Sequence, residues 1–447
     1  MPSTRVGVPA AAPETSRFAI AVVLVTAVAV AVRVLYVAFV AQHHAPLGFD
    51  STAYYLIAGP LARGHGYSDG VIAFSHHYVP TANYPPLYPL FLAALQRAGL
   101  KSVFEARVAS SIAGAATVPL AALVGRRLAG ARVGIVAAAL VALWPFLVAT
   151  DGSLMSETIA VPLVTGALLA TLWAREALGL WRWAVVGALF ALGALARAEA
   201  PLLMVIVIGA ALLATRELSA RTRIRAGAAA LAGFAVISAP WVGYVVHEVG
   251  AGGLWATDSA KTLAGANCPS TYYGPGIGLW DSACTVPVDW PRRTEREAAA
   301  DNRERAQHYA RAHVARAPLV ATVRVLRTAG LYAPRQQHDF EVIESRNAKW
   351  QTLAWWCYVA VLPLAAYGLV LLLRRRRGAA VIVAAIVGVV VASAISDGNE
   401  RLRMVVEPQI LVAAATAFVA LEARLHSRSR NRNHDPNHKV PEQAASS

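Results

Sequence analysis

Charged side chains are scarce in this sequence. Only 15% of its 447 residues are Asp, Glu, Lys or Arg, whereas soluble domains carry about 25%. Hydrophobic residues make up 57% of the chain, and the mean hydropathy is +0.48. This balance excludes an ordinary soluble domain and is typical of a protein embedded in a lipid bilayer.

Motifs for nucleotide use and for several common hydrolase reactions are also missing. The chain contains no Walker, GxSxG, HExxH or CxxC pattern, and each of these marks a specific phosphate, nucleophile or metal site. The histidines show no spacing typical of metal ligands. We therefore assign no metal ligand and no certain cofactor, and we keep a divalent metal as an open alternative.

Cysteine is rare, with three residues in the whole chain. Cys357 lies in an apolar run and is interpreted as a core residue. Cys268 and Cys284 share one long loop, so they form a disulfide if that loop faces an oxidising compartment and stay free thiols if it does not.

Long apolar runs, by contrast, recur from end to end. A membrane span needs about 20 such residues, and the runs are continuous rather than alternating as transmembrane strands would be. We predict an all-α polytopic membrane protein with about ten transmembrane helices, an uncleaved first span, and juxtamembrane helices in the first external loop. The runs occupy residues 18–40, 106–125, 133–149, 157–174, 183–196, 201–215, 226–247, 352–373, 378–396 and 405–423.

The net charge of +15 gathers in short basic clusters beside these runs. They include residues 216–225, the RRRR run at 374–377 and the segment that begins at Arg424. Lys and Arg beside a span mark its cytoplasmic side. The charge distribution therefore indicates membrane topology and argues against nucleic acid as a partner.

Placing these clusters in the cytoplasm determines the predicted topology. It requires the apolar segment 84–95 to stay on the outer surface, since a run of about twelve residues is too short to span. The predicted divisions are a cytoplasmic N-terminal segment (1–17), a seven-helix module with external loop 41–105 (18–247), an extracytoplasmic loop with interfacial helices (248–351), C-terminal transmembrane helices (352–423) and a basic disordered cytoplasmic tail (424–447).

The first external loop contains an isolated carboxylate, Asp50, soon after Pro46 and Gly48. One interpretation is structural: Asp50 begins a short helix over 49–62 and stabilises its N-terminus. The other is chemical, since a carboxylate beside a low-dielectric region has a raised pKa and can act as a general base. Tyr54 lies one turn further on the same face and is a candidate substrate ligand.

Other charged residues sit at or inside the external ends of the runs. Asp151 and Glu157 are candidate catalytic carboxylates, although capping of the next helix also explains them. A charge inside the bilayer costs about 2.5–3.5 kcal/mol on insertion scales, so Arg33, Arg197 and Glu199 are expected to line a polar cavity. For Arg33 the alternative is a side chain that snorkels outward.

Arg401 and Arg403 lie just before the last run, on the predicted outer side, where basic residues oppose the usual trend. A guanidinium pairs bidentately with phosphate oxygens, so both are candidate ligands for a lipid phosphate. The alternative is a loop held together by its own ion pairs. Tyr84 and Tyr88, in the rigid turn NYPPLYP, are either interfacial aromatic residues or contacts for the donor lipid.

The order of these features resembles the GT-C superfamily of glycosyltransferases, which includes bacterial aminoarabinose transferases and protein O-mannosyltransferases. The matching stretches run from the first apolar run almost to the last and are GFDSTAYYLIAGPLARGHGY, NYPPLYPLFLAAL, GRRLAGARVGIVAAALVALWPF, DGSLMSE, ARAEAP and GNERLRMVVEP.

The resemblance implies residue roles. The family's catalytic Asp falls on Asp50, its second acid on Asp151 or Glu157, and its basic motif on Arg401 and Arg403. Two departures bear on the substrates: the protein O-mannosyltransferases have Asp-Glu where this chain has Asp50-Ser51, and the Lys that aminoarabinose transferases carry near the aromatic turn is missing.

The resemblance also implies a polyprenyl-phosphate-linked sugar as donor, a lipid, polysaccharide or protein as acceptor, and contacts with membrane lipids. The expected location is the plasma membrane, crossed many times, with the active site on the extracytoplasmic face. The main alternative function is a lipid or sugar transporter or flippase, which would place its charges near the middle of the bilayer. A polysaccharide polymerase or ligase of another fold is a further alternative.

Overall fold

The computed structural model describes residues 12–44, 47–177, 179–215, 218–250, 255–375 and 378–433. Within these ranges the chain is almost entirely helical, and its only β-structure consists of two isolated bridges, Ser68–Pro80 and Asp289–Arg293. The predicted all-α class is confirmed.

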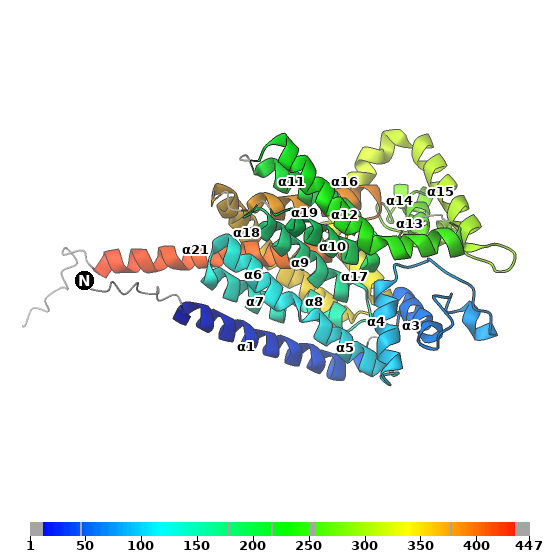
Figure 1. The fold of residues 1–447 in the computed structure, drawn as a ribbon, viewed down its shortest axis with the longest axis horizontal. Coiled ribbons are helices and arrows are strands. Elements are labelled where there is room, and N and C mark those ends of the chain that lie inside the picture. Colours follow the sequence, from blue (N-terminus) through cyan, green and yellow to red (C-terminus); the bar gives the residue numbers. More distant parts are fainter. Residues whose placement is uncertain are drawn as a thin grey trace, which may run out of the picture.

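The predicted spans correspond to helices that run side by side along the long axis of the molecule (Figure 1). Among the described residues, six helical stretches are long and apolar enough to cross a membrane, and a seventh counts if the bent pair α7–α8 is one span. Three more apolar helices are shorter, so the count of ten stays a prediction. The helices are α1 (Ala12–Tyr36), α5 (Val103–Gly114) with α6 (Thr117–Ala129), α7 (Ala131–Leu143) with α8 (Pro145–Asp151), α9 (Glu157–Ala174), α10 (Leu180–Ala196), α11 (Ala200–Ala214), α12 (Ala220–Tyr244), α18 (Ala348–Arg375), α19 (Ala379–Ile395), and α20 (Glu400–Arg403) with α21 (Glu407–Asn433).

Small residues allow these helices to approach closely, as is common where helices associate in lipid. A Cβ atom on Gly187 of α10 would lie 1.8 Å from the Ala230 carbonyl oxygen of α12. One on Gly368 of α18 would lie 1.7 Å from the Ala413 carbonyl oxygen of α21. Only glycine permits these two backbone contacts.

Helix α21 lies among the other spans, and most of its apolar stretch is buried. It continues through Asn433, past the predicted start of a disordered tail at Arg424, because the sequence there (LEARLHSR) is rich in residues that favour a helix. Residues 434–447 of that predicted tail lie outside the described part.

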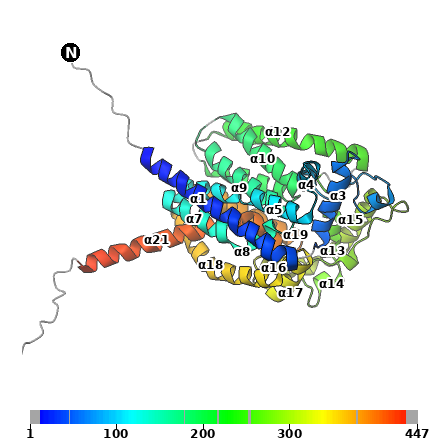
Figure 2. The ribbon, with the colours of Figure 1, turned by 90° about the horizontal axis from the view of Figure 1, so that it is seen from below.

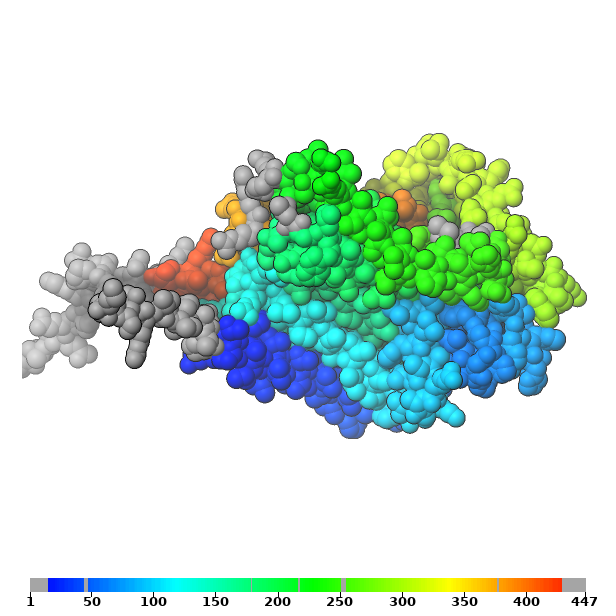
Figure 3. Space-filling model, viewed as in Figure 1, coloured from blue at the N-terminus to red at the C-terminus, as the bar shows by residue number. Residues whose placement is uncertain are grey.

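The short helices gather at one end of the bundle, while the start of α1 and the end of α21 lie at the other (Figures 1 and 2). Figure 3 shows residues of the first loop, in blue, beside the yellow-green chain around residue 300 at that end. These helices are α3 (Phe49–Ala62), α4 (Leu87–Arg97), α13 (Asp258–Ala266), α14 (Pro269–Tyr272), α15 (Glu295–Ala312), α16 (Ala317–Thr328) and α17 (Pro334–Ile343).

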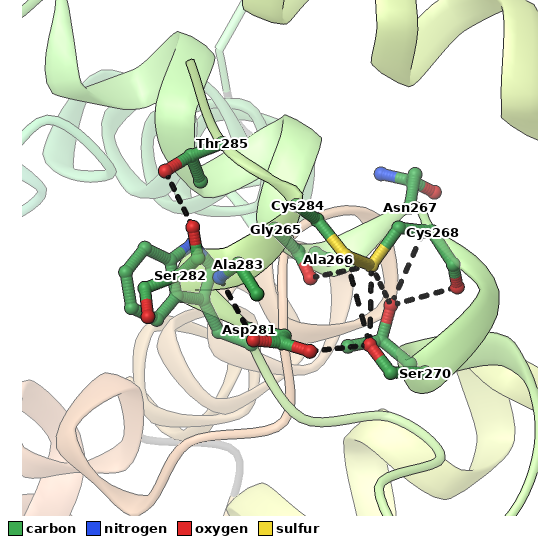
Figure 4. The surroundings of a disulfide bond; sticks show 12 residues. Gly265, Ala266, Asn267, Cys268, Ser270, Asp281, Ser282, Ala283, Cys284 and Thr285 are labelled. Atoms are coloured by element: carbon green, nitrogen blue, oxygen red, sulfur yellow. Dashed lines mark hydrogen bonds between the residues drawn. A yellow bond between two sulfur atoms is a disulfide. The ribbon is translucent and has the colours of Figure 1, made fainter. Parts of the chain in front are cut away.

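The long loop before α18 is folded and cross-linked. Cys268 and Cys284 form a disulfide with a Cα–Cα distance of 6.2 Å (Figure 4). Helix α15, expected in this loop, begins with a capping box between Thr294 and Glu297. The loop therefore has a defined shape from which side chains can be directed at the rest of the molecule.

Candidate functional site

Arg401 is the centre of a buried group of charged side chains at the end of the bundle where the short helices lie. Its Nε donates to Glu157 Oε1 at 2.6 Å, and its Nη1 donates to Asp50 Oδ2 at 2.8 Å. Glu344 Oε1 lies 3.4 Å from the same Nη1. Asp50 and Arg401, which are 351 positions apart in the sequence, are thus direct hydrogen-bond partners.

The backbone before α20 explains how Arg401 is held. The Asn399 side chain caps α20 by accepting from the Arg401 backbone N–H at 2.9 Å. The preceding loop is tied to the segments packed on it, because Gly398 donates to the Gly278 carbonyl and Asn399 donates to the Thr328 hydroxyl. The helix begins abruptly and presents Arg401 toward α3 and α9.

Asp50 lies in the first turn of α3, but it is not the group that closes the cap. The Ser51 hydroxyl accepts from the Gly48 backbone N–H at 2.9 Å, whereas Asp50 accepts from side chains of other segments. Tyr84 donates its phenolic hydrogen to Asp50 Oδ1 at 2.9 Å, and Arg401 donates to the other carboxylate oxygen, Oδ2. Burial, and next the Asp50 charge, raise the pKa of Tyr84, which keeps it a donor.

Tyr84 belongs to a row of aromatic rings. The Tyr54 ring lies edge-on between Tyr84 and Tyr88, with centroid distances of 4.8 Å and 5.2 Å. Tyr54 donates to the Ser156 hydroxyl at 3.2 Å, and Tyr88 shares a hydrogen bond with Ser110. Among the three predicted tyrosines, Tyr84 is therefore the one that contacts Asp50, and the other two support it.

Glu157 is surrounded by arginines from three segments. In addition to Arg401, Arg197 Nη1 lies 2.7 Å from Glu157 Oε1, and Arg346 Nη2 lies 4.0 Å from it. Arg197 also forms an ion pair with Glu199. The predicted residues between α10 and α11 therefore belong to the Asp50 site through Glu157.

Asp151 and Arg33 form a separate ion pair. Arg33 Nε donates to Asp151 Oδ2 at 2.7 Å, and its Nη1 donates to the Ala142 carbonyl at 2.9 Å. Arg33 is completely buried, so it does not snorkel outward. The pair lies against Gly114, where an added Cβ would come 2.2 Å from Asp151 Oδ1. The geometry thus links Glu157, and not Asp151, to Arg401.

Arg403 also points away from Asp50. Its Nε donates to Glu407 Oε1 at 2.6 Å and its Nη1 to the Thr328 carbonyl at 2.9 Å. Its guanidinium lies 3.6 Å from the centre of the Tyr358 ring. These contacts attach α20 and α21 to α16 and α18, and the role of Arg403 as a phosphate ligand stays a prediction.

Residues of the long loop complete the site, and their roles were not predicted from the sequence. Arg346 Nη1 lies 2.5 Å from Glu341 Oε2, so the end of α17 adds an ion pair to the Glu157 group. Glu344 adds a carboxyl beside Arg401. A charged cluster immediately before a span was the only available indication, since these residues are far in sequence from every motif.

Helix α13 forms a second wall beside the aromatic turn. Its first residues are fixed to that turn, because Thr257 donates to the Ala82 carbonyl and Asp258 to the Asn83 carbonyl. Lys261 Nζ donates to Asn83 Oδ1 at 2.5 Å. The aromatic turn, which has no Lys nearby in the sequence, thus receives one from a distant segment.

Carboxylates outnumber cations in this cluster. Its members are Asp50, Glu157, Glu199, Glu341 and Glu344 against Arg197, Arg346 and Arg401. Burial, reinforced by the Asp50 charge, raises the pKa of Glu344 to about 8, and burial raises the pKa of Glu341. Burial also raises the pKa of Asp258 to about 6, against the opposing effect of Lys261.

No metal site emerges among the carboxylates of the described residues. In that part of the chain, the one group of metal-ligand atoms within 4.8 Å of one another comprises Cys268, Asp281 and Cys284. Both of these cysteine sulfurs are used in the disulfide. A divalent metal near Asp50 therefore stays an open prediction.

Comparison with known proteins agrees with the resemblance seen in the sequence. Residues 83–242 match the family model of dolichyl-phosphate-mannose-protein mannosyltransferases. No curated protein sequence matches the chain.

Solved structures share the fold. The archaeal oligosaccharyltransferase AglB from Archaeoglobus fulgidus, in complex with an inhibitory peptide and a dolichol-phosphate, superposes with a TM-score of 0.54 at 14% identity, over 96% of this chain and 53% of that chain. Its apo form gives 0.54 at 15% identity, over 93% and 52%. A weaker similarity, too low to argue for a shared fold, is to ArnT from Cupriavidus metallidurans bound to undecaprenyl phosphate, with a TM-score of 0.43 at 14% identity, over 96% of this chain and 82% of that chain.

The chain spans about half the length of the oligosaccharyltransferase chains that it matches. The predicted resemblance to GT-C glycosyltransferases is confirmed by the shared fold together with the family match over residues 83–242.

The Arg33–Asp151 pair yields a stability prediction. Asp151→Ala leaves the Arg33 cation buried without a counter-ion, and the loss of one partner of a buried pair costs about 3–5 kcal/mol. We expect a clearly lower thermal unfolding midpoint for Asp151→Ala in detergent solution.

Replacing both partners removes the charge as well as the pair, so Arg33→Met combined with Asp151→Leu should recover most of the lost midpoint. An Asp151→Ala variant that unfolds at the wild-type temperature would show that the pair is not structural.

Proposed function

We propose that this protein is a membrane glycosyltransferase that moves a sugar from a polyprenyl-phosphate donor to an acceptor hydroxyl on the outer face of the membrane, with Asp50 as general base. The observation that carries this proposal is the Asp50 carboxylate held between the Arg401 guanidinium and the Tyr84 hydroxyl. The family match and the shared fold support a transferase of this class.

The chemistry needs only a base and cations. The acceptor oxygen attacks the anomeric carbon of the donor sugar, and the bond from that carbon to the phosphate oxygen breaks. Asp50 takes the acceptor proton, and the polyprenyl phosphate leaves with the electron pair of the broken bond. Direct displacement inverts the anomeric configuration.

Arg401 is suited to both halves of this step. It fixes Asp50 through Nη1, and its positive charge lies beside the place where the departing phosphate develops negative charge. Glu157 anchors the same guanidinium through Nε, so the position of Arg401 does not depend on Asp50 alone. Lys261 of α13, which donates to Asn83 beside Tyr84, is a second candidate ligand for the phosphate.

The outer-face assignment rests on the distribution of basic residues. Arg126 and Arg127 end α6, and Arg374 and Arg375 end α18, both far along the bundle from the site. Basic residues at helix ends favour the cytoplasm. The loops that carry Asp50 and Arg401 are then on the other side.

A transporter or flippase is the alternative from the sequence. A transporter of this kind would have its polar site midway along the bundle, at interrupted helices that occur at matching positions in two repeated halves of the chain. The charged group around Arg401 instead lies at the end where α3, α13 and α17 gather, so no observation favours this alternative.

The general-base role of Asp50 predicts how the Asp50→Asn substitution changes the rate of sugar transfer. Asp50→Asn keeps the shape of the side chain but removes its basicity, so transfer should fall by about 10²–10⁴-fold. The measurement is transfer of labelled sugar from polyprenyl phosphate sugars in membranes. Asp289→Asn is the matched control, since the Asp289 side chain is 59% exposed.

The thermal midpoint of Asp50→Asn must be measured alongside, because Arg401 loses one partner. Normal transfer by a folded Asp50→Asn protein would refute the general-base role, and a product of retained anomeric configuration would refute direct displacement.

The raised pKa of Glu344 predicts that the donor KM depends on pH. Because its pKa is raised to about 8, its carboxyl is neutral below that pH and ionised above it. Ionisation adds a negative charge beside Arg401, which repels the donor phosphate. The donor KM should rise about fivefold to tenfold as the pH increases through 8, which corresponds to roughly 1 kcal/mol.

Glu344→Gln keeps the neutral form at every pH, so the rise in KM above pH 8 should vanish in this variant. The Asp258→Asn variant is a useful comparison, because the pKa of Asp258 is raised only to about 6. A Glu344→Gln protein with the same alkaline rise in KM as the wild type would contradict this assignment.

A further inference from the structure

Glu295, the first residue of α15, binds groups that lie outside its own helix. Its Oε2 accepts from the Thr81 hydroxyl at 2.6 Å, and its Oε1 accepts from the Ala82 backbone N–H at 2.9 Å. The Thr257 hydroxyl also donates to Oε1, at 2.5 Å. This one carboxylate therefore joins the first loop, 214 positions away at Thr81, to the start of α13.

Capping of α15 does not require Glu295. The Thr294 hydroxyl accepts from the Glu297 backbone N–H, and Glu297 Oε2 accepts in return from the Thr294 backbone N–H at 2.8 Å. An acidic residue in the first turn also favours a helix through the helix dipole, but Glu297 supplies that charge as well. The contacts between Glu295 and the first loop therefore need a reason outside α15.

The three donors that Glu295 binds belong to buried residues. Thr81 and Ala82 are completely buried, and Thr257 is 2% exposed. A buried N–H or hydroxyl that lacks an acceptor destabilises the folded state, so each of these groups needs the carboxylate. Removing the Glu295 side chain would therefore release the segment that contains Thr81 and Ala82 from its place.

That segment leads directly to Tyr84. Ala82 precedes Tyr84 by two positions, and Pro85 and Pro86 follow it, so the backbone beyond Tyr84 has little freedom to adjust. Tyr84 in turn donates to Asp50 Oδ1 at 2.9 Å. Because few torsions separate Ala82 from the Tyr84 ring, a shift of Ala82 moves the phenolic oxygen relative to Asp50.

Other hydrogen bonds hold the same segment and set the expected size of the effect. The Tyr67 hydroxyl donates to the Tyr84 carbonyl at 3.0 Å, and the Thr257 backbone N–H donates to the Ala82 carbonyl at 2.8 Å. These contacts do not involve the Glu295 side chain, so the segment should shift without detaching when Glu295 is replaced. A partial loss of activity is therefore expected.

We propose that Glu295 is a positioning residue for sugar transfer, which holds Tyr84 where its hydroxyl can donate to Asp50. This inference rests on the proposed function, and it adds a residue that acts on the reaction through others. Since Glu295 acts through Ala82 and Tyr84, the effect of losing it must depend on the Tyr84 hydroxyl.

Three substitutions separate this role from the stability of α15. Glu295→Ala removes all three hydrogen bonds. Glu295→Gln keeps an oxygen that can accept from the Ala82 N–H and adds an amide group that can donate to the Thr81 hydroxyl. Glu297→Ala is the matched control, because the Glu297 carboxylate binds Thr294 in the capping box of the same helix.

The first measurement is kcat for sugar transfer by the full-length protein in nanodiscs, with and without the Tyr84→Phe substitution. Two residues that act independently give equal losses in both backgrounds, whereas coupled residues do not. We expect Glu295→Ala to lower kcat about tenfold in the protein that has Tyr84, and less than about twofold in Tyr84→Phe. Glu295→Gln should stay within about threefold of the wild type, and Glu297→Ala should match the wild type.

Losses of the same factor in both backgrounds, or a wild-type kcat in folded Glu295→Ala, would refute the positioning role. A Glu295→Gln protein as slow as Glu295→Ala would contradict its basis in hydrogen bonds. If Glu295→Ala does not fold, Thr81→Val replaces it, since this change removes one of the three hydrogen bonds and keeps the size of the side chain. Its loss in kcat, about threefold, should also vanish in Tyr84→Phe.

A second measurement does not depend on sugar transfer. A fluorotyrosine in place of Tyr84 reports its surroundings by fluorine NMR, and its resonance should move in Glu295→Ala and stay in place in Glu297→Ala. An unchanged resonance in Glu295→Ala would show that Glu295 does not position Tyr84. If the wild type transfers no sugar from any donor, the proposed function fails, and the fluorine spectrum still decides whether Glu295 holds Tyr84.

Discussion

The arrangement of the site depends on the buried guanidinium of Arg401, which bonds to Asp50 from the first loop and to Glu157 from α9. A buried charge is tolerated only when it is paired and hydrogen-bonded, so these segments must converge wherever Arg401 is placed. Arg197 and Arg346 extend the same constraint to the α10–α11 turn and to the long loop. One ionic group therefore aligns four distant parts of the chain.

The charged residues near the site differ in the partners that they bind. Arg33 forms an ion pair with Asp151, and Arg403 forms one with Glu407, so each of these arginines has a carboxylate partner that is not Asp50. Asp50, by contrast, accepts a hydrogen bond from Tyr84, and Lys261 of α13 donates to Asn83, the residue before Tyr84.

The all-α class and the positions of the apolar helices could be predicted from continuous apolar runs. Asp50 could be proposed as an isolated carboxylate in the first external loop, Glu157 as a carboxylate at the external end of a run, and Arg401 as a basic residue that opposes the usual charge trend. Periodicity could not decide between Asp151 and Glu157, because both follow the same run and only packing assigns each its arginine. Glu344, Arg346 and Lys261 escaped prediction because long-loop folding delivers them, and no local pattern encodes such contacts.

The most direct test of the central claim, that Arg401 and Asp50 form the donor site, is a structure of the protein in lipid nanodiscs with a bound polyprenyl phosphate. The account predicts phosphate oxygens at about 3 Å from the Arg401 guanidinium, with Asp50 facing the adjoining space. A phosphate bound elsewhere, with Arg401 still fully engaged by Asp50 and Glu157, would contradict it.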